Sequence, residues 1–141
     1  MSLRELYQEI VMDHYSDPRN FGKMDNPDYA VHINNPSCGD EIDLEVAVEN
    51  GRIEQIKFHG HGCVLSQASA SIMTEMIQGQ ELTYIQDLAD NVRYFITGKG
   101  EVKMDLQELE IFEGVKKFPL RVKCATLAWS ALRDILQKIE S

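Results

Sequence analysis

The sequence predicts an α+β fold in which a small three-stranded antiparallel sheet carries helices packed on one face. Apolar residues first recur at steps of three and four, as in a helix, and then alternate with polar residues on both sides of Asn50-Gly51, as in a hairpin. The helical period then returns for the rest of the chain. Because this order contains no linker, repeat or low-complexity tract, we expect one domain over residues 1–141.

The first expected helix covers residues 3–15, and the side chain of Ser2 is suited to cap its first turn. The stretch SDPRNFG at 16–22 follows, and its proline, asparagine and glycine are turn residues that end the helix. A short strand is expected next, over residues 29–33.

A β-hairpin is expected in the middle of the chain. Its first strand shows the alternation over 42–48, and Asn50-Gly51 is a strong signal for a two-residue turn, because both turn residues need a positive φ. The return strand is expected over 52–60. Ile53 is out of phase with the later apolar residues of this strand, so we expect a bulge near the turn.

The remainder of the chain predicts helices. They are expected over residues 64–77, 81–96, 105–113 and 119–139. Gly79 ends the first of these runs, and Pro119 suits the first turn of the last helix. Helices that follow a sheet in this order pack on one face of it.

The charge of the chain argues against two classes of partner. The 23 acidic and 14 basic residues give a formal net charge of −9 at pH 7. Nucleic acids and anionic membrane surfaces repel such a chain, so neither is expected as a partner. No stretch approaches the roughly 18 apolar residues of a membrane-spanning helix, and charged residues interrupt the N-terminal segment where a signal peptide would be apolar. We therefore expect a cytoplasmic protein.

Three cysteines carry the chemical information of the sequence, and an odd number in a reducing compartment argues against a disulfide framework. Cys38 lies in the turn sequence PSCGDE, two residues before Asp40, and is either an incidental loop cysteine or a metal ligand. Cys63 opens a helix, where backbone N–H groups and the helix dipole favour a metal-binding thiolate. The alternative for Cys63 is a cysteine packed beneath the helix start.

Cys124 is open to two interpretations as well. On the apolar face of a helix, a cysteine is usually a small buried hydrophobic residue. Arg121 and Lys123, however, lie within one turn of Cys124, and their positive charges favour a thiolate.

Three thiolates and the carboxylate of Asp40 would together form an acceptable tetrahedral zinc site. The spacing alone is not diagnostic, because the chain has no CxxC pair and long stretches separate the cysteines. His59 and His61 compete as fourth ligands, since strand positions i and i+2 point to the same side. The alternative is that both histidines are polar residues facing solvent.

Four segments of the chain together resemble the IscU/NifU-type iron–sulfur cluster assembly proteins. They are MDHYSDPRNFG at 12–22, NNPSCGDEI at 34–42, GHGCVLSQASAS at 60–71 and KFPLRVKCATLAW at 117–129. Within this family the chain is similar to the SufU branch. Lys123 replaces the histidine that precedes the third cysteine of IscU-type proteins, and residues 98–117 resemble an additional segment of SufU-type proteins.

The resemblance implies that Cys38, Asp40, Cys63 and Cys124 bind Zn²⁺ and that Arg121 lies near the metal. It also implies a zinc-dependent sulfurtransferase of iron–sulfur cluster biogenesis, in which Cys38 accepts persulfide sulfur from a PLP-dependent cysteine desulfurase of the SufS type. The chain would then be the second substrate and activator of that enzyme, with other cluster-assembly proteins downstream. The alternative is a scaffold that assembles a [2Fe–2S] cluster on the same residues. A third hypothesis is a small zinc-stabilised binding module without sulfur chemistry.

Overall fold

A computed structural model describes residues 2–141 of the chain. In chain order its elements are α1 (Leu3–Ser16), β1 (Tyr29–Asn35), β2 (Asp40–Glu49), β3 (Arg52–His61), α2 (Val64–Ile77), α3 (Leu82–Thr97), the 3₁₀ helix η1 (Gln107–Lys117) and α4 (Pro119–Glu140). This order of one helix, a sheet and then helices confirms the predicted α+β class. Within residues 2–141, no helix combines the length and the apolar character that a membrane crossing requires.

The sheet is antiparallel, with the strand order β1-β2-β3. Asn50 and Gly51 form the predicted turn, with φ values of 53° and 73°. The register shifts between Ala47 and Val48, so that Val48 pairs with Ile53. This is the expected bulge, and it returns Ile53 to the buried face of the sheet.

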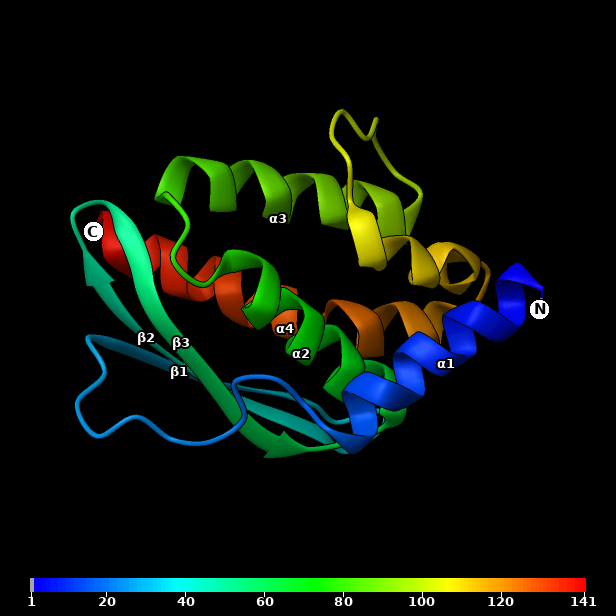
Figure 1. Ribbon diagram of the computed structural model, residues 1–141, viewed down its shortest axis with the longest axis horizontal. Coiled ribbons are helices and arrows are strands. Elements are labelled where there is room, and N and C mark those ends of the chain that lie inside the picture. Colours follow the sequence, from blue (N-terminus) through cyan, green and yellow to red (C-terminus); the bar gives the residue numbers. More distant parts are fainter. Residues whose placement is uncertain (1) are drawn as a thin grey trace.

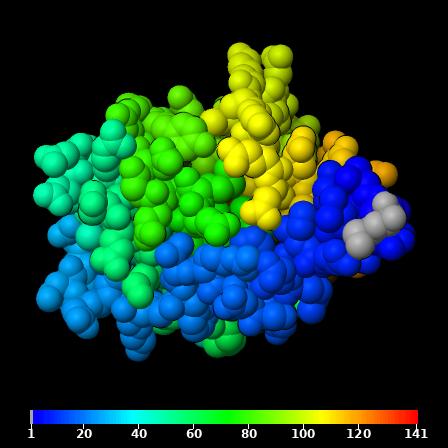
Figure 2. Space-filling model, in the orientation of Figure 1, coloured from blue at the N-terminus to red at the C-terminus, as the bar shows by residue number. Residues whose placement is uncertain are grey.

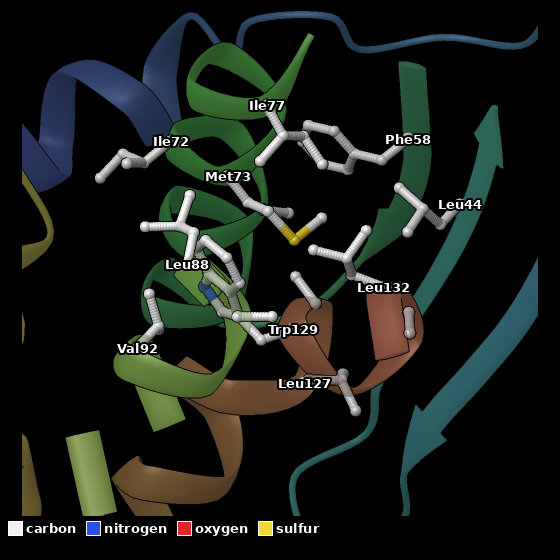
Figure 3. Close-up of a cluster of buried hydrophobic side chains, with 14 of the residues drawn as sticks. Leu44, Phe58, Ile72, Met73, Ile77, Leu88, Val92, Leu127, Trp129 and Leu132 are labelled. Atoms are coloured by element: carbon white, nitrogen blue, oxygen red, sulfur yellow. The ribbon is translucent and has the colours of Figure 1, made fainter. Parts of the chain in front are cut away.

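One face of the sheet packs against the helices, as predicted (Figure 1). The apolar residues of that face with no exposed surface are Ile42, Leu44, Val46, Ile53, Ile56 and Phe58. Helix α4 contacts β1 and β2, α2 contacts β3, and α1 and α3 pack outside these two helices. In Figure 3, Leu44 and Phe58 of the sheet face Met73 of α2 and Leu132 of α4. Helices α2 and α4 form the layer on the sheet, and they place Cys63 and Cys124 at one end of it.

A helix is present near the predicted range 105–113, but it is the 3₁₀ helix Gln107–Lys117 and extends further toward the C-terminus than predicted. Leu109, Phe112 and Val115 are its buried residues, and they recur every three residues. A 3₁₀ helix has three residues per turn, so this spacing places all three side chains on one side. Figure 2 shows the stretch between α3 and this helix as a projection from the surface.

Candidate metal centre

Cys38 lies in the tight turn that joins β1 to β2. The backbone N–H groups of Cys38 and Gly39 both donate to the carbonyl oxygen of Asn35, at 3.2 and 2.9 Å. Gly39 has a φ of +71°, a conformation that glycine adopts without strain. The turn leaves Cys38 exposed, whereas Asp40 at the start of β2 has no exposed surface.

Cys63 is the N-cap residue of α2, which confirms that it opens a helix. Its backbone N–H donates to Oδ1 of Asp40 at 2.7 Å, so the carboxylate satisfies a donor at the helix start and lies at the positive end of the helix dipole. Gly62 makes this approach feasible, because a Cβ atom at this position would overlap Oδ1 of Asp40. A glycine is therefore needed where β3 leads into α2.

Cys124 lies in the second turn of α4, on its apolar face, and is buried. Its Sγ is 3.2 Å from Sγ of Cys38, and Sγ of Cys38 is 3.0 Å from Oδ2 of Asp40. Donor atoms of these three residues all lie within 4.8 Å of one another. Sγ of Cys63 lies 3.6 Å from Oδ2 of Asp40, at the side of this triple. Four residues that are far apart in the sequence therefore converge in one cluster.

The cluster shifts the acidities of its members. Burial raises the pKa of Cys38, and the hydrogen bond that its thiol donates to Asp40 raises it further. Burial also raises the pKa of Cys124, with added contributions from Cys38 and Cys63. Burial alone would raise the pKa of Asp40, but the donors Cys38 Sγ and Cys63 N–H outweigh it and leave that pKa below its usual value. Without a metal, the cluster therefore favours the anionic form of Asp40 and the protonated thiols of Cys38 and Cys124.

The donor set fits a zinc ion. Zinc binds sulfur at about 2.3 Å and carboxylate oxygen at about 2.0–2.2 Å, so the ligand atoms of a tetrahedral site lie about 3.4–3.8 Å apart. The distances of 3.0, 3.2 and 3.6 Å lie near this range. Sγ of Cys63 is outside the group of donor atoms that all lie within 4.8 Å of one another, so its side chain would have to rotate toward the other sulfurs to complete a four-ligand site. Three sulfurs and one oxygen are also donors that zinc accepts.

His59 and His61 do not join the cluster. As expected for positions i and i+2, they lie on one side of β3, where they pair with Asp43 and Glu41 across the strand. Nε2 of His61 is 2.7 Å from Glu41, and Nε2 of His59 is 3.6 Å from Asp43. These carboxylates alternate with buried Ile42, so the two histidines lie on the opposite face of the sheet from the helices.

Arg121 lines a surface groove together with Cys63 and Cys124. Its guanidinium carbon lies 4.7 Å from the centre of the Phe118 ring. The groove also includes the exposed apolar side chain of Leu120. Arg121 therefore shares this groove with two of the three cysteines.

The sequence model of the NifU-like N-terminal domain family matches residues 6–138. The chain belongs to this family. The match confirms the resemblance that the four segments indicated.

Relatives of this NifU-like chain carry two kinds of name. The zinc-dependent sulfurtransferase SufU of Bacillus subtilis is 41% identical over 140 residues, covering 99% of this chain and 95% of the relative. The iron–sulfur cluster assembly scaffold protein IscU of Streptococcus pyogenes is 40% identical over 137 residues, covering 96% of this chain and 86% of the relative. Among solved structures, the SufU protein of Fervidobacterium islandicum AW-1, described as an iron–sulfur cluster assembly scaffold protein for the SUF system, is 33% identical with a TM-score of 0.85, and the match covers 96% of this chain and 99% of that one.

The sequence of this NifU-like chain did not reveal two polar residues beside the cysteines. Asn35 precedes the Cys38 turn, and Gln67 lies one helical turn after Cys63. Within residues 2–141, the side-chain nitrogen atoms of both are buried and have no hydrogen-bond partner. The only sequence signal was the presence of Gln67 in the otherwise small and apolar run of α2.

Proposed function

We propose that this protein is a zinc-dependent sulfur acceptor, which takes persulfide sulfur from a PLP-dependent cysteine desulfurase of the SufS type and supplies iron–sulfur cluster assembly. The observation that carries the proposal is the convergence of three cysteines and one aspartate with a single exposed thiol, that of Cys38. The SufU relative of Bacillus subtilis, which aligns over 99% of this chain, is named a zinc-dependent sulfurtransferase, and this name supports the proposal. We place the reaction in the cytoplasm, where the three cysteines stay reduced.

Cys38, Asp40, Cys63 and Cys124 would hold the zinc ion. Bound there, zinc keeps the three sulfurs as thiolates at neutral pH and lowers their reactivity without any redox chemistry of its own. Three of the four ligands are fixed by regular structure: Asp40 in β2, Cys63 at the start of α2 and Cys124 within α4.

Cys38 is the ligand that can act as nucleophile. It lies on a turn and is exposed, so its side chain can move toward a partner while the buried Asp40 and Cys124 stay in place. The Cys38 thiolate attacks the terminal sulfur of the desulfurase persulfide. A new S–S bond forms on Cys38, the S–S bond of the desulfurase breaks, and the desulfurase cysteine leaves as a thiolate. The electrons balance without an external oxidant.

Positive charge beside the cluster supports the approach of an anionic persulfide. The groove that includes Cys63 and Cys124 is lined by four basic residues, Arg4, Lys116, Lys117 and Arg121, and by one acidic residue, Glu113, although the chain as a whole has a net charge of −9. Local cations of this kind attract an anionic sulfur and stabilise the thiolate that leaves.

The test compares the wild type with Cys38→Ala in the presence of a cysteine desulfurase and cysteine. We expect the wild type to raise desulfurase turnover and to gain about 32 Da, the mass of one sulfur atom, on Cys38. Cys38→Ala should do neither, whereas Ser37→Ala, in the exposed neighbouring position, should behave as the wild type. Equal stimulation by Cys38→Ala would show that another residue accepts the sulfur.

The second candidate is a scaffold for a [2Fe–2S] cluster, because the same sulfurs can ligate iron and a relative with 40% identity is named as a scaffold. Lys123, which precedes Cys124, offers an exposed cation rather than a ligand and favours the zinc proposal. Protein purified without air separates the two: a colourless zinc protein supports sulfur transfer, and a brown protein with iron and sulfide supports the scaffold. A zinc protein that never acquires sulfur would be a binding module only.

A further inference from the structure

Three potential metal ligands meet on the side of the molecule where α1 ends. His14 lies in the last turn of α1, Glu75 lies on α2 and Glu108 lies on η1. One donor atom from each residue lies within 4.8 Å of the other two. None of the four residues of the cysteine cluster belongs to this group, so it is a separate place in the fold.

His14 is rigidly oriented. Its side chain is only 2% exposed, and its Nδ1 lies 2.7 Å from Oγ of Ser71. The same hydroxyl oxygen accepts the backbone N–H of Arg19 at 2.8 Å, which fixes Ser71 in turn. A histidine that binds a metal through one nitrogen is usually oriented by a hydrogen bond at the other. The free nitrogen of His14, Nε2, faces Oε2 of Glu108 at 3.6 Å, beyond hydrogen-bonding distance.

The charges around His14 favour a cation. Arg19 donates to the carboxylate of Asp13 at 2.6 Å and to the carbonyl oxygen of Asp17 at 3.0 Å. Its positive charge is therefore balanced mainly by Asp13. Its Nε lies 3.8 Å from Glu75, a longer contact that a metal ion would have to compete with. The two glutamates, Glu75 and Glu108, therefore remain as excess negative charge, and the C-terminal end of α1 adds a partial negative charge.

We propose that His14, Glu75 and Glu108 form a second metal site, for a divalent first-row transition ion. One imidazole nitrogen and two carboxylate oxygens, without sulfur, suit Mn²⁺, Fe²⁺ or Zn²⁺ and not a soft ion such as Cu⁺. Ligand atoms around such an ion lie about 3 Å apart. The glutamate side chains are 45% and 49% exposed, so they are free to close the remaining distance by changing rotamer while His14 stays fixed.

An ion at this site would join three elements that otherwise meet through few polar contacts. It would tie η1 to α1 and α2, and η1 leads directly into α4, which carries Cys124. The site does not depend on sulfur transfer, and its presence or absence leaves the role of Cys38 unaffected.

The test titrates Mn²⁺ into the full chain after a single equivalent of Zn²⁺ has been added to occupy the cysteines and free zinc has been removed, and counts bound Mn²⁺ by electron paramagnetic resonance. Mn²⁺ prefers oxygen and nitrogen donors, so it does not displace zinc from sulfur. We expect one bound Mn²⁺ per chain. Glu75→Gln and Glu108→Gln should each weaken binding by ~10–100-fold. Glu110→Gln, an exposed neighbour on the same 3₁₀ helix, should leave it unchanged.

Paramagnetic broadening of histidine NMR signals gives the location. The imidazole of His14 should broaden at the lowest Mn²⁺ concentration, before those of His32, His59 and His61, which lie on the outer face of the sheet. The proposal is overturned if no Mn²⁺ binds, if both glutamine variants bind as tightly as the wild type, or if a histidine of the sheet broadens first. The last two results would mean diffuse binding to an acidic surface.

Discussion

Replacement of Asp40 separates its role in the fold from its role as a ligand. Asp40 has no exposed surface, and its Oδ1 accepts the backbone N–H of Cys63 at 2.7 Å. Asp40→Ala leaves this donor at the start of α2 without a partner, and a hydrogen bond to a charged group contributes about 1.5–3 kcal/mol. The release of a buried charge offsets part of that, so we expect a loss of about 2 kcal/mol in the metal-free protein. Asp40→Asn keeps a carbonyl oxygen for the N–H group and should lose about 1 kcal/mol.

Urea unfolding of the reduced, metal-free variants measures this effect. With a typical dependence on urea, a loss of 2 kcal/mol lowers the midpoint by about 1 M. The urea midpoint should be highest for the wild type, lower for Asp40→Asn and lowest for Asp40→Ala. Both variants should also bind zinc more weakly, as measured by competition with a chromophoric chelator, because each removes the carboxylate ligand. A wild-type midpoint for Asp40→Ala would refute the structural role, and wild-type zinc affinity for Asp40→Asn would refute the role as ligand.

Three further predictions concern the same cluster. Removal of zinc with a chelator should lower the thermal midpoint by about 8 °C, since an ion present at about 100 times its Kd contributes about 2.7 kcal/mol; equal midpoints by calorimetry would contradict this. Because the folded pKa values of Cys38 and Cys124 are raised, their contribution to stability is complete below about pH 8.5 and is lost as the pH rises above it. The urea midpoint of the metal-free protein should therefore fall in alkaline buffer, and it should fall less for Cys124→Ala. A midpoint that rises with pH would contradict the raised pKa values. Gly62→Ala should displace Asp40 and weaken zinc binding, whereas Gly114→Ala, where a Cβ meets nothing within 4 Å, is the matched control.

The hairpin was predictable because its signals are local. Asn50 and Gly51 adopt the positive φ values that their turn requires, and this sets the register of β2 against β3. Ile53 breaks the alternation of apolar and polar residues in the sequence, and the bulge compensates for this by a shift in register. Each of these features depends on residues fewer than ten positions apart.

The 3₁₀ helix was mispredicted for a related reason. Leu109, Phe112 and Val115 recur at steps of three, and over so short a segment this pattern does not distinguish three residues per turn from 3.6. Tertiary packing decides between a 3₁₀ helix and an α-helix here, because all three side chains must reach the core together. Gln107, with a φ of +51°, begins the segment in a conformation that an α-helix does not allow.

The sequence spacing of the cysteines could not by itself predict that they form a cluster. Cys63 follows Cys38 by 25 positions and Cys124 follows Cys63 by 61, and no local rule relates residues so far apart. The link between Asp40 and Cys63 comes from strand register instead. Glu41 pairs with His61, so the preceding residue of β2 meets Gly62, where the chain turns into α2. The hairpin thus places a carboxylate at a helix start, and α4 brings the last sulfur.

The four residues of the cluster differ in how firmly the fold holds them, and this difference underlies the proposed chemistry. Asp40 is buried and bonded to the start of α2, and Cys124 is buried within α4. Cys38 is exposed on a turn, held by backbone hydrogen bonds to Asn35 and, at its sulfur, by Asp40 and Cys124. A sulfur acceptor must keep the reactivity of its thiolate low until a partner binds and must then release the thiolate to react. In the proposed chemistry, a fold with three fixed donors and one on a turn would meet both needs, because the fixed donors would retain the ion while Cys38 reacts.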